Sequence, residues 1–280
     1  MSSGEHRILV EVCVDSVESA LAAARGGADR LELCGNLGLG GGTTPSVGLY
    51  RRVRKAVPNL PIMVMIRPRT GDFLYTPSEF EVMQEDVQSF KELGADGVVF
   101  GVLQADGWID VERTRQLAEA ADGMQVCFHR AFDMTPHPES EVEGSTPLVQ
   151  LAQIPNITRI LTSGRGPSVP TSVRPIRAFL RAAEILSERH RTPTNPLTIL
   201  PGSGLNPGTV PAFVHDVLLL GLREIHLSGS GWIDGSMEFR KEGMGMGVGG
   251  QGDWGIWRTN EEVIRQVRKA VDEAREKFQT

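Results

Sequence analysis

Short stretches in which apolar and polar residues alternate recur along the chain, and a stretch with helical spacing follows each of them. In residues 8–14, valines occupy every second position from Val10 and alternate with Glu11 and Cys13, which is the period of a strand with one apolar face. The pattern predicts eight strands, at residues 8–14, 30–34, 61–67, 98–100, 125–129, 159–162, 197–200 and 224–227.

The segments between the expected strands carry the start signals of helices. The clearest is Thr76–Glu79, where a threonine N-cap, a proline at the first helical position and a capping-box glutamate coincide. Eight alternating strand–helix units predict an α/β protein with one TIM-type (β/α)8 barrel domain, residues 1–280, rather than an open doubly wound sheet. A C-terminal helix is expected at 259–278, and the Gly/Met-rich stretch 235–256 is expected to be an insertion, either a mobile lid or a segment without a role.

Composition narrows the class of protein. The chain has 280 residues, 40% of them hydrophobic, so a folded core is expected rather than a disordered chain. A net charge of −6 without a basic run argues against nucleic acid or an anionic membrane surface as a partner, and no stretch is apolar enough to span a membrane. The N-terminus lacks a signal-peptide pattern and the chain has only 3 cysteines, so we expect a cytoplasmic protein, with a nuclear presence also compatible.

In a barrel of this kind, functional side chains gather at the carboxyl ends of the strands. Polar residues at those ends predict a pocket in which Glu11 and Glu32 pair with Arg67 and His129. Asp133, shortly after the fifth strand, belongs to the same group of candidate catalytic residues. The alternative is an ordinary ion-pair network at the mouth of the barrel.

A second set of residues at the strand ends is suited to contact a ligand. Glycine turns follow the seventh and eighth strands, where many barrels hold a phosphate on backbone N–H groups. The candidate ligand-binding residues are Arg69, Ser163, Gly202, Gly204, His226 and Ser228.

The cysteines form a separate line of evidence. Cys13 and Cys34 occupy equivalent inward positions on adjacent expected strands, so their sulfurs could bind one soft cation such as Cu(I). The alternative is that they are buried free thiols, which pack as small apolar side chains. Cys127 alternates with Phe128 and is expected to face the helices.

Several longer motifs allow comparison with known proteins. They are residues 11–19, 26–34, 41–46, 64–69, 128–133 and 161–164. Together they resemble the CutC copper-homeostasis family over about residues 8–234, and residues 235–240 resemble an extension of its eukaryotic members. The resemblance implies a cytoplasmic barrel, usually oligomeric, that is linked to copper tolerance and binds Cu(I) through cysteines. Cys13 and Cys34 lie in the matching motifs.

Three functions are compatible with these observations, and the third and weakest is a scaffold that acts through the surface of its oligomer. The first is a copper-homeostasis protein that binds Cu(I) through Cys13 and Cys34. The second is a TIM-barrel enzyme for a small anionic or phosphorylated metabolite, with His129 as the acid/base, Glu11 or Asp133 as its partner and Arg67 as the anion clamp. Whether the protein is an enzyme stays open at this point.

The expected helix at 77–93 predicts a homo-oligomer. It carries Phe80, Met83, Val87 and Phe90 beside Val82, an apolar arc wider than one packing face needs. The simplest assembly is a two-fold dimer.

Overall fold

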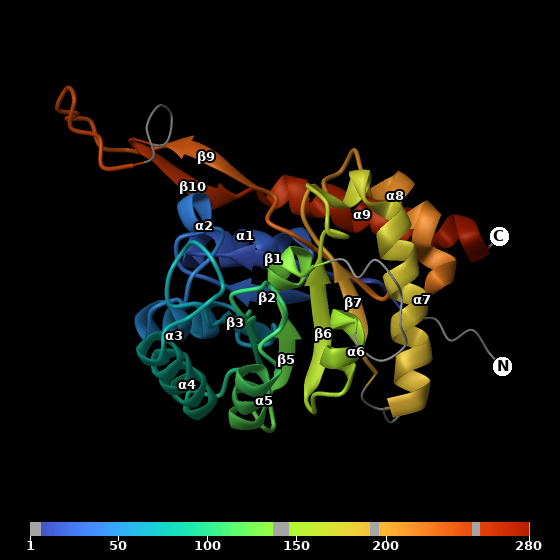
Figure 1. The fold of residues 1–280 in the computed structure, drawn as a ribbon. Coiled ribbons are helices and arrows are strands. Elements are labelled where there is room, and N and C mark those ends of the chain that lie inside the picture. Colours follow the sequence, from blue (N-terminus) through green and yellow to red (C-terminus); the bar gives the residue numbers. More distant parts are fainter. Residues whose placement is uncertain (1–6, 137–145, 191–195, 248–252, 280) are drawn as a thin grey trace.

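Eight parallel strands alternate with helices around a barrel in the computed structural model (Figure 1). The structure describes residues 7–136, 146–190, 196–247 and 253–279. The barrel strands are β1 (Leu9–Val14), β2 (Arg30–Leu33), β3 (Ile62–Met65), β4 (Gly97–Phe100), β5 (Gln125–Phe128), β6 (Ile157–Thr162), β7 (Thr198–Pro201) and β8 (Glu224–Leu227).

The helices cover the outside of the barrel (Figure 1). They are α1 (Val17–Gly26), α2 (Leu37–Gly40), α3 (Val47–Ala56), α4 (Pro77–Glu92), α5 (Val111–Ala120), α6 (Pro147–Ala152), α7 (Val173–His190), α8 (Val210–Val217) and α9 (Glu261–Gln279). Short 3-10 turns are η1 (Arg130–Met134), η2 (Val169–Thr171) and η3 (Leu218–Leu220). The capping box expected at Thr76 and Glu79 starts α4. None of the described helices is long and apolar enough to cross a membrane.

The order of the strands closes the sheet on itself. The order is β7-β6-β5-β4-β3-β2-β1-β8, and an isolated bridge between Gly202 and His226 joins β7 to β8. The protein is therefore a single-domain (β/α)8 barrel of the TIM type, as the alternation predicts.

The strands separate two apolar clusters. The larger lies between strands and helices and receives Val10, Val12 and Val14 from β1. The smaller consists of Cys34, Met63, Met65, Val99, Cys127, Leu161 and Leu200. The prediction that Cys127 faces the helices is wrong. Phe128, the bulkier neighbour, packs in the larger cluster, so alternation along β5 turns Cys127 to the opposite, interior side.

The apolar arc of α4 does not form a free surface. Phe80, Met83, Val87 and Phe90 are buried within the single chain, and only Val82 is exposed, at 48%. Our reason for predicting a homo-oligomer is therefore wrong, because this arc packs against the chain's own core. The homo-oligomer itself stays a prediction.

The predicted insertion at 235–256 extends a two-stranded hairpin. β9 (Ser230–Asp234) and β10 (Gly255–Thr259) pair antiparallel, with Trp232 and Trp257 in edge contact at 5.3 Å. Residues 235–247 run beyond the hairpin and project away from the barrel (Figure 1), whereas 248–252 lie outside the described residues.

Two helical glycines allow a test of how α1 meets α9. A methyl group added at Gly26 would lie 2.6 Å from Ile264 Cβ and 2.8 Å from the Glu261 carbonyl oxygen. We expect Gly26→Ala to lower the free energy of unfolding by about 1–3 kcal/mol, because the two helices would have to separate. Urea denaturation measures the change.

Gly48→Ala in α3 is the matched control. The only atom near its added methyl group is Ser46 Oγ at 3.8 Å, so the change should be neutral or stabilising by at most about 1 kcal/mol. Equal effects of the two substitutions would contradict the close packing of α1 on α9.

Candidate metal centre

A network of buried charges fills the barrel at the amino-terminal ends of the strands. Arg30 forms ion pairs with Glu11 and, through Nη2 at 2.6 Å, with Glu224. Arg159 Nε lies 3.0 Å from the same Glu224 carboxylate. All four side chains are at most 9% exposed, so each charge depends on its partners in place of water.

The partners of Glu11 differ from those predicted. In the parallel register, Glu11 lies opposite Arg30 on β2 and opposite His226 on β8. Its carboxylate binds both of these residues, whereas no ion pair in the described residues joins Arg67 to a carboxylate. Arg67 comes after the end of β3 and is therefore too far along its strand to reach Glu11.

A cluster of possible metal ligands lies beside this network, toward the carboxyl ends of β8, β1 and β2. Ligand atoms of Cys13, Glu32 and His226 all lie within 4.8 Å of one another, and all three side chains are buried. The register explains the cluster, since Cys13 lies opposite Glu32 on the neighbouring strand. Cys34, the second predicted thiol ligand, adjoins the cluster and donates to Glu32 Oε2 at 3.5 Å.

Hydrogen bonds orient the members of the cluster. Glu11 Oε1 and His226 Nδ1 lie 2.8 Å apart, which leaves His226 Nε2 on the side of Glu32 Oε2, at 3.8 Å. Glu32 Oε1 is buried without a hydrogen-bond partner. Cys13 Sγ makes a long bond of 3.7 Å to the Leu227 carbonyl oxygen.

Burial and neighbouring charges shift the protonation of this cluster. Burial raises the pKa of Cys13, and burial together with Glu32 raises the pKa of Cys34 well above its usual value. Burial also raises the pKa of Glu32. Burial alone would lower the pKa of His226, but Cys13 and the two carboxylates outweigh it and raise the pKa well above the usual value. These side chains therefore hold protons that a bound cation would displace.

Two predicted catalytic residues, Arg67 and His129, lie together at the rim rather than in this cluster. The Arg67 guanidinium lies 5.0 Å from the centre of the Phe73 ring, and the His129 ring lies 4.8 Å from it. Arg67 donates to the carbonyl oxygens of Gly40, at 2.8 Å, and Gly71, at 3.0 Å. Burial lowers the pKa of His129 to about 3, and the charge of Arg67 acts in the same direction.

Asp133 is occupied by backbone and side-chain donors of the loop after β6. Its carboxylate accepts from the N–H groups of Ser163, at 3.0 Å, and Arg165, at 3.1 Å, and it pairs with Arg130 at 2.8 Å. His129 Nδ1 instead accepts from the N–H of Ala131 at 3.2 Å. The prediction that Glu11 or Asp133 orients His129 is therefore wrong.

Most other predicted ligand-binding residues have structural partners. Arg69 pairs with Glu79 at 2.6 Å, and Ser163 Oγ donates to Gly166 at 2.6 Å. Gly202 makes the bridge that joins β7 to β8. Gly204 adopts a left-handed conformation with φ of 76°, and Ser228 Oγ accepts from the N–H of Ser230 at 3.4 Å. Of the ligand-binding set, only His226 belongs to the metal-ligand cluster.

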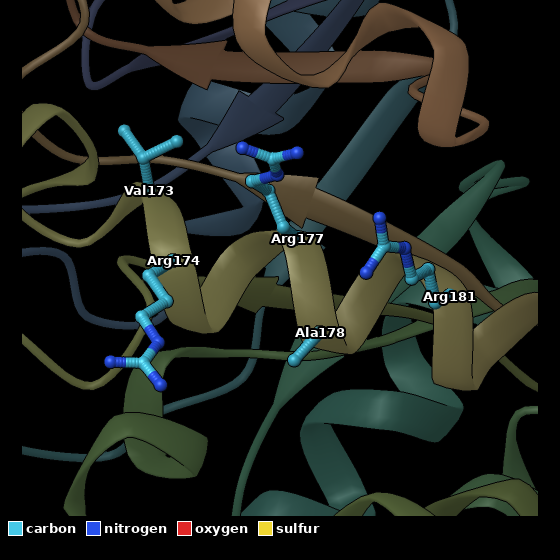
Figure 2. A pocket seen from close by; sticks show the side chains of 5 residues that line it. All are labelled: Val173, Arg174, Arg177, Ala178 and Arg181. Carbon is cyan, nitrogen blue, oxygen red and sulfur yellow. The ribbon is translucent and has the colours of Figure 1, made fainter.

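A hollow of about 550 Å³ lies on the outer helix α7 rather than in the barrel. It is lined by Val173, Arg174, Arg177, Ala178 and Arg181 (Figure 2). Arg174 projects to a different side from Arg177 and Arg181, so the three guanidinium groups do not converge on one point (Figure 2). None of the site residues predicted from the sequence belongs to this helix.

The pocket predicted from the sequence does not include Arg30, Arg159 or Glu224, which form the buried ion-pair network with Glu11. Arg30 shares the alternation phase of Glu32 and Cys34, and Glu224 shares that of His226. Period-two alternation therefore indicates that both side chains point into the barrel, but they lie near the amino-terminal ends of their strands and not at the carboxyl ends, where the pocket is predicted. Arg159 follows the same rule on β6, opposite Thr198.

Comparison with known proteins gives a consistent result. The family model of the CutC family matches residues 8–231. A CutC family protein of Chromobacterium violaceum is 39% identical over 266 residues, covering 95% of this chain and 99% of the relative. The human copper homeostasis protein cutC homolog is 40% identical over 240 residues, covering 86% of this chain and 80% of the relative.

Solved structures agree with the sequence comparison. The crystal structure of a CutC protein from Streptococcus agalactiae has a TM-score of 0.63 and 30% identity, covering 79% of this chain and 98% of the other. A sialic acid aldolase of Ruminococcus gnavus, with a TM-score of 0.53, 14% identity and coverage of 81% and 69%, shares the barrel fold alone.

The lowered pKa of His129 predicts a pH dependence of stability. Between about pH 6.5, the ordinary pKa in the unfolded chain, and pH 3, the unfolded chain binds a proton that the folded protein excludes. Stability should therefore fall as the pH falls, by about 1.4 kcal/mol for each pH unit below 6.5. His129→Asn keeps an acceptor for the Ala131 N–H and removes the titration.

Urea denaturation at pH 7.5 and pH 5 checks this dependence. The wild type should lose about 2 kcal/mol more than His129→Asn over this interval. Equal losses would mean that His129 is protonated as easily in the folded protein as in the unfolded chain.

Proposed function

The chain belongs to the CutC family, and we propose that it serves copper homeostasis by binding Cu(I) in the interior of its barrel. One observation carries the proposal: the ligand atoms of Cys13, Glu32 and His226 lie within 4.8 Å of one another in a buried cluster. Thiolate and imidazole are donors that suit copper, and the buried position excludes competing water.

Cys13 Sγ and His226 Nε2 are the principal ligands in this proposal. A histidine that binds a metal almost always donates its other ring N–H to a carboxylate or carbonyl oxygen. Glu11 Oε1, 2.8 Å from His226 Nδ1, is placed for that role. The second carboxylate oxygen of Glu11 pairs with Arg30, so the orientation of the His226 imidazole depends on the buried ion-pair network.

Cys34 supplies a second thiol from the next strand. Its sulfur lies 3.5 Å from Glu32 Oε2, and Glu32 is itself a member of the cluster. Soft thiolate ligands select Cu(I) over harder ions. A monovalent ion also suits a buried centre, because one thiolate neutralises its charge and little charge has to be taken out of water.

Glu32 fits the role of proton acceptor in this centre. Cu(I) binds a thiolate and a neutral imidazole nitrogen, so each coordinating cysteine and His226, whose pKa is raised, must release a proton when the ion enters. Glu32 can take up one of these protons, and the others pass to solvent. Glu32 Oε2 already accepts a hydrogen bond from Cys34, and Oε1 is free to accept another. Burial raises the pKa of Glu32, which makes its carboxylate a better acceptor for a displaced proton.

A cytoplasmic location accords with this function. Cys13, Cys34 and Cys127 are free thiols, and a reducing compartment keeps thiols in that state. The proposal requires no partner other than the copper ion.

Substitution of either principal ligand tests the proposal. Cys13→Ser and His226→Gln should each abolish stoichiometric Cu(I) retention against a chromogenic Cu(I) chelator, because each removes a donor atom. Glu11→Gln should weaken the affinity about 10–100-fold through the orientation of His226. Cys34→Ser should also weaken it.

Cys127→Ser is the matched control. Cys127 is buried in the interior with Met63 and Met65, outside the Cys13–Glu32–His226 cluster, and should retain wild-type affinity. Loss of Cu(I) binding in Cys127→Ser with retention in His226→Gln would place the ion among the interior sulfurs instead and overturn the ligand assignment.

A further inference from the structure

Three buried polar side chains at the rim of the barrel each carry an atom without a hydrogen-bond partner. The atoms are Arg67 Nε, Tyr75 Oη and His129 Nε2. The side chains are 8%, 3% and 4% exposed, so water does not solvate them freely. Unsatisfied buried polar atoms are rare in folded proteins, and each calls for a physical reason.

Two of the three side chains contact one aromatic ring, and the third lies close to Arg67. The Arg67 guanidinium lies 5.0 Å from the centre of the Phe73 ring, and the centre of the His129 imidazole lies 4.8 Å from it. Burial raises the pKa of Tyr75 to about 12, whereas the charge of Arg67 and an interaction of its guanidinium with the Tyr75 hydroxyl oxygen act in the opposite direction, which leaves the hydroxyl hydrogen to be donated elsewhere. Arg67 and His129 follow the carboxyl ends of β3 and β5, where barrels of this type bind their ligands.

All three free atoms are hydrogen-bond donors. His129 Nδ1 accepts from the Ala131 N–H, so the hydrogen of the neutral imidazole lies on Nε2. The free atom of Arg67 is an N–H of a guanidinium, which has no acceptor, and Tyr75 offers a phenolic O–H. The missing partner of all three is therefore an acceptor.

Arg67 also lacks a counter-charge. Its Nη1 and Nη2 atoms donate to the carbonyl oxygens of Gly40, Gly42 and Gly71, and none of the described carboxylates forms an ion pair with it. A buried cation without a paired anion is costly, and an anionic ligand would remove that cost.

We propose that Arg67, Tyr75 and His129 bind the carboxylate of a small organic monoanion at the rim, independently of copper. A monoanion matches the single uncompensated charge of Arg67. Three of the five N–H groups of that guanidinium donate to carbonyl oxygens, which leaves at most Nε–H and one N–H of Nη2 for the two oxygens of a carboxylate. The apolar face of Phe73 suits the organic part of such a ligand.

Tyr75→Phe is the most selective test, because it removes only the unpartnered hydroxyl. Copper-free protein is titrated calorimetrically with pyruvate, acetate and inorganic phosphate. We expect saturable binding of a monocarboxylate, weakened about tenfold or more in Tyr75→Phe, since a hydrogen bond to a charged group is lost. The variant without ligand should melt no lower than the wild type.

Three further variants test whether the monocarboxylate binds at the rim and not elsewhere on the protein. Tyr50→Phe removes the hydroxyl that bonds to Leu93 and should bind like the wild type. Arg177→Met removes a cation of the hollow on α7 and should also leave binding unchanged. His129→Asn should weaken binding as Tyr75→Phe does, and it provides a second variant should the first fold poorly.

Four results would overturn the proposal. They are no saturable binding of either monocarboxylate, tighter binding of phosphate than of monocarboxylates, equal affinities of the wild type and the two rim variants, and a lowered melting temperature of ligand-free Tyr75→Phe. The last would show that the hydroxyl has a structural partner. Because no copper is present, failure here leaves the Cu(I) proposal untouched.

Discussion

The pairing of charges inside the barrel is the constraint on which the rest of the structure depends. Glu11, Arg30 and Glu224 are 2%, 4% and 3% exposed, so each charge is tolerated only because the others face it. The pairing also fixes how the strands align. A slip of β1 by one residue against β2 would turn Glu11 toward the helices and leave Arg30 short of one partner, which makes the aligned register strongly favoured.

The same pairing prepares the proposed metal centre. Glu11 uses one carboxylate oxygen for Arg30 and the other for His226 Nδ1, and this second bond turns Nε2 toward Glu32. The Glu11–Arg30 ion pair therefore sets the position of the His226 imidazole before an ion binds. A centre prepared in this way loses little side-chain freedom when it binds a ligand.

The sequence predicted the barrel and the inward side chains far better than it predicted their partners. Alternation along one strand shows that Glu11 and Cys13 point inward, because that property is local. Whether Glu11 meets Arg30 or Arg67 depends on the register between strands, which alternation does not contain. Arg67 was misplaced for a related reason: carbonyl oxygens of two neighbouring loops hold its guanidinium at the rim.

The two proposed sites have opposite electrostatic character. The interior cluster offers a thiol, a carboxylate and an imidazole with displaceable protons, which suits a cation, whereas the rim offers donors and an unpaired positive charge, which suits an anion. Residues of both proposed sites contact the loop at Gly42. Its carbonyl oxygen accepts from Arg67 Nη1 at 3.1 Å, and a methyl group added at Gly42 would lie 3.0 Å from Cys34 Sγ. The thiol beside the cation cluster and the guanidinium of the anion site therefore contact the same loop.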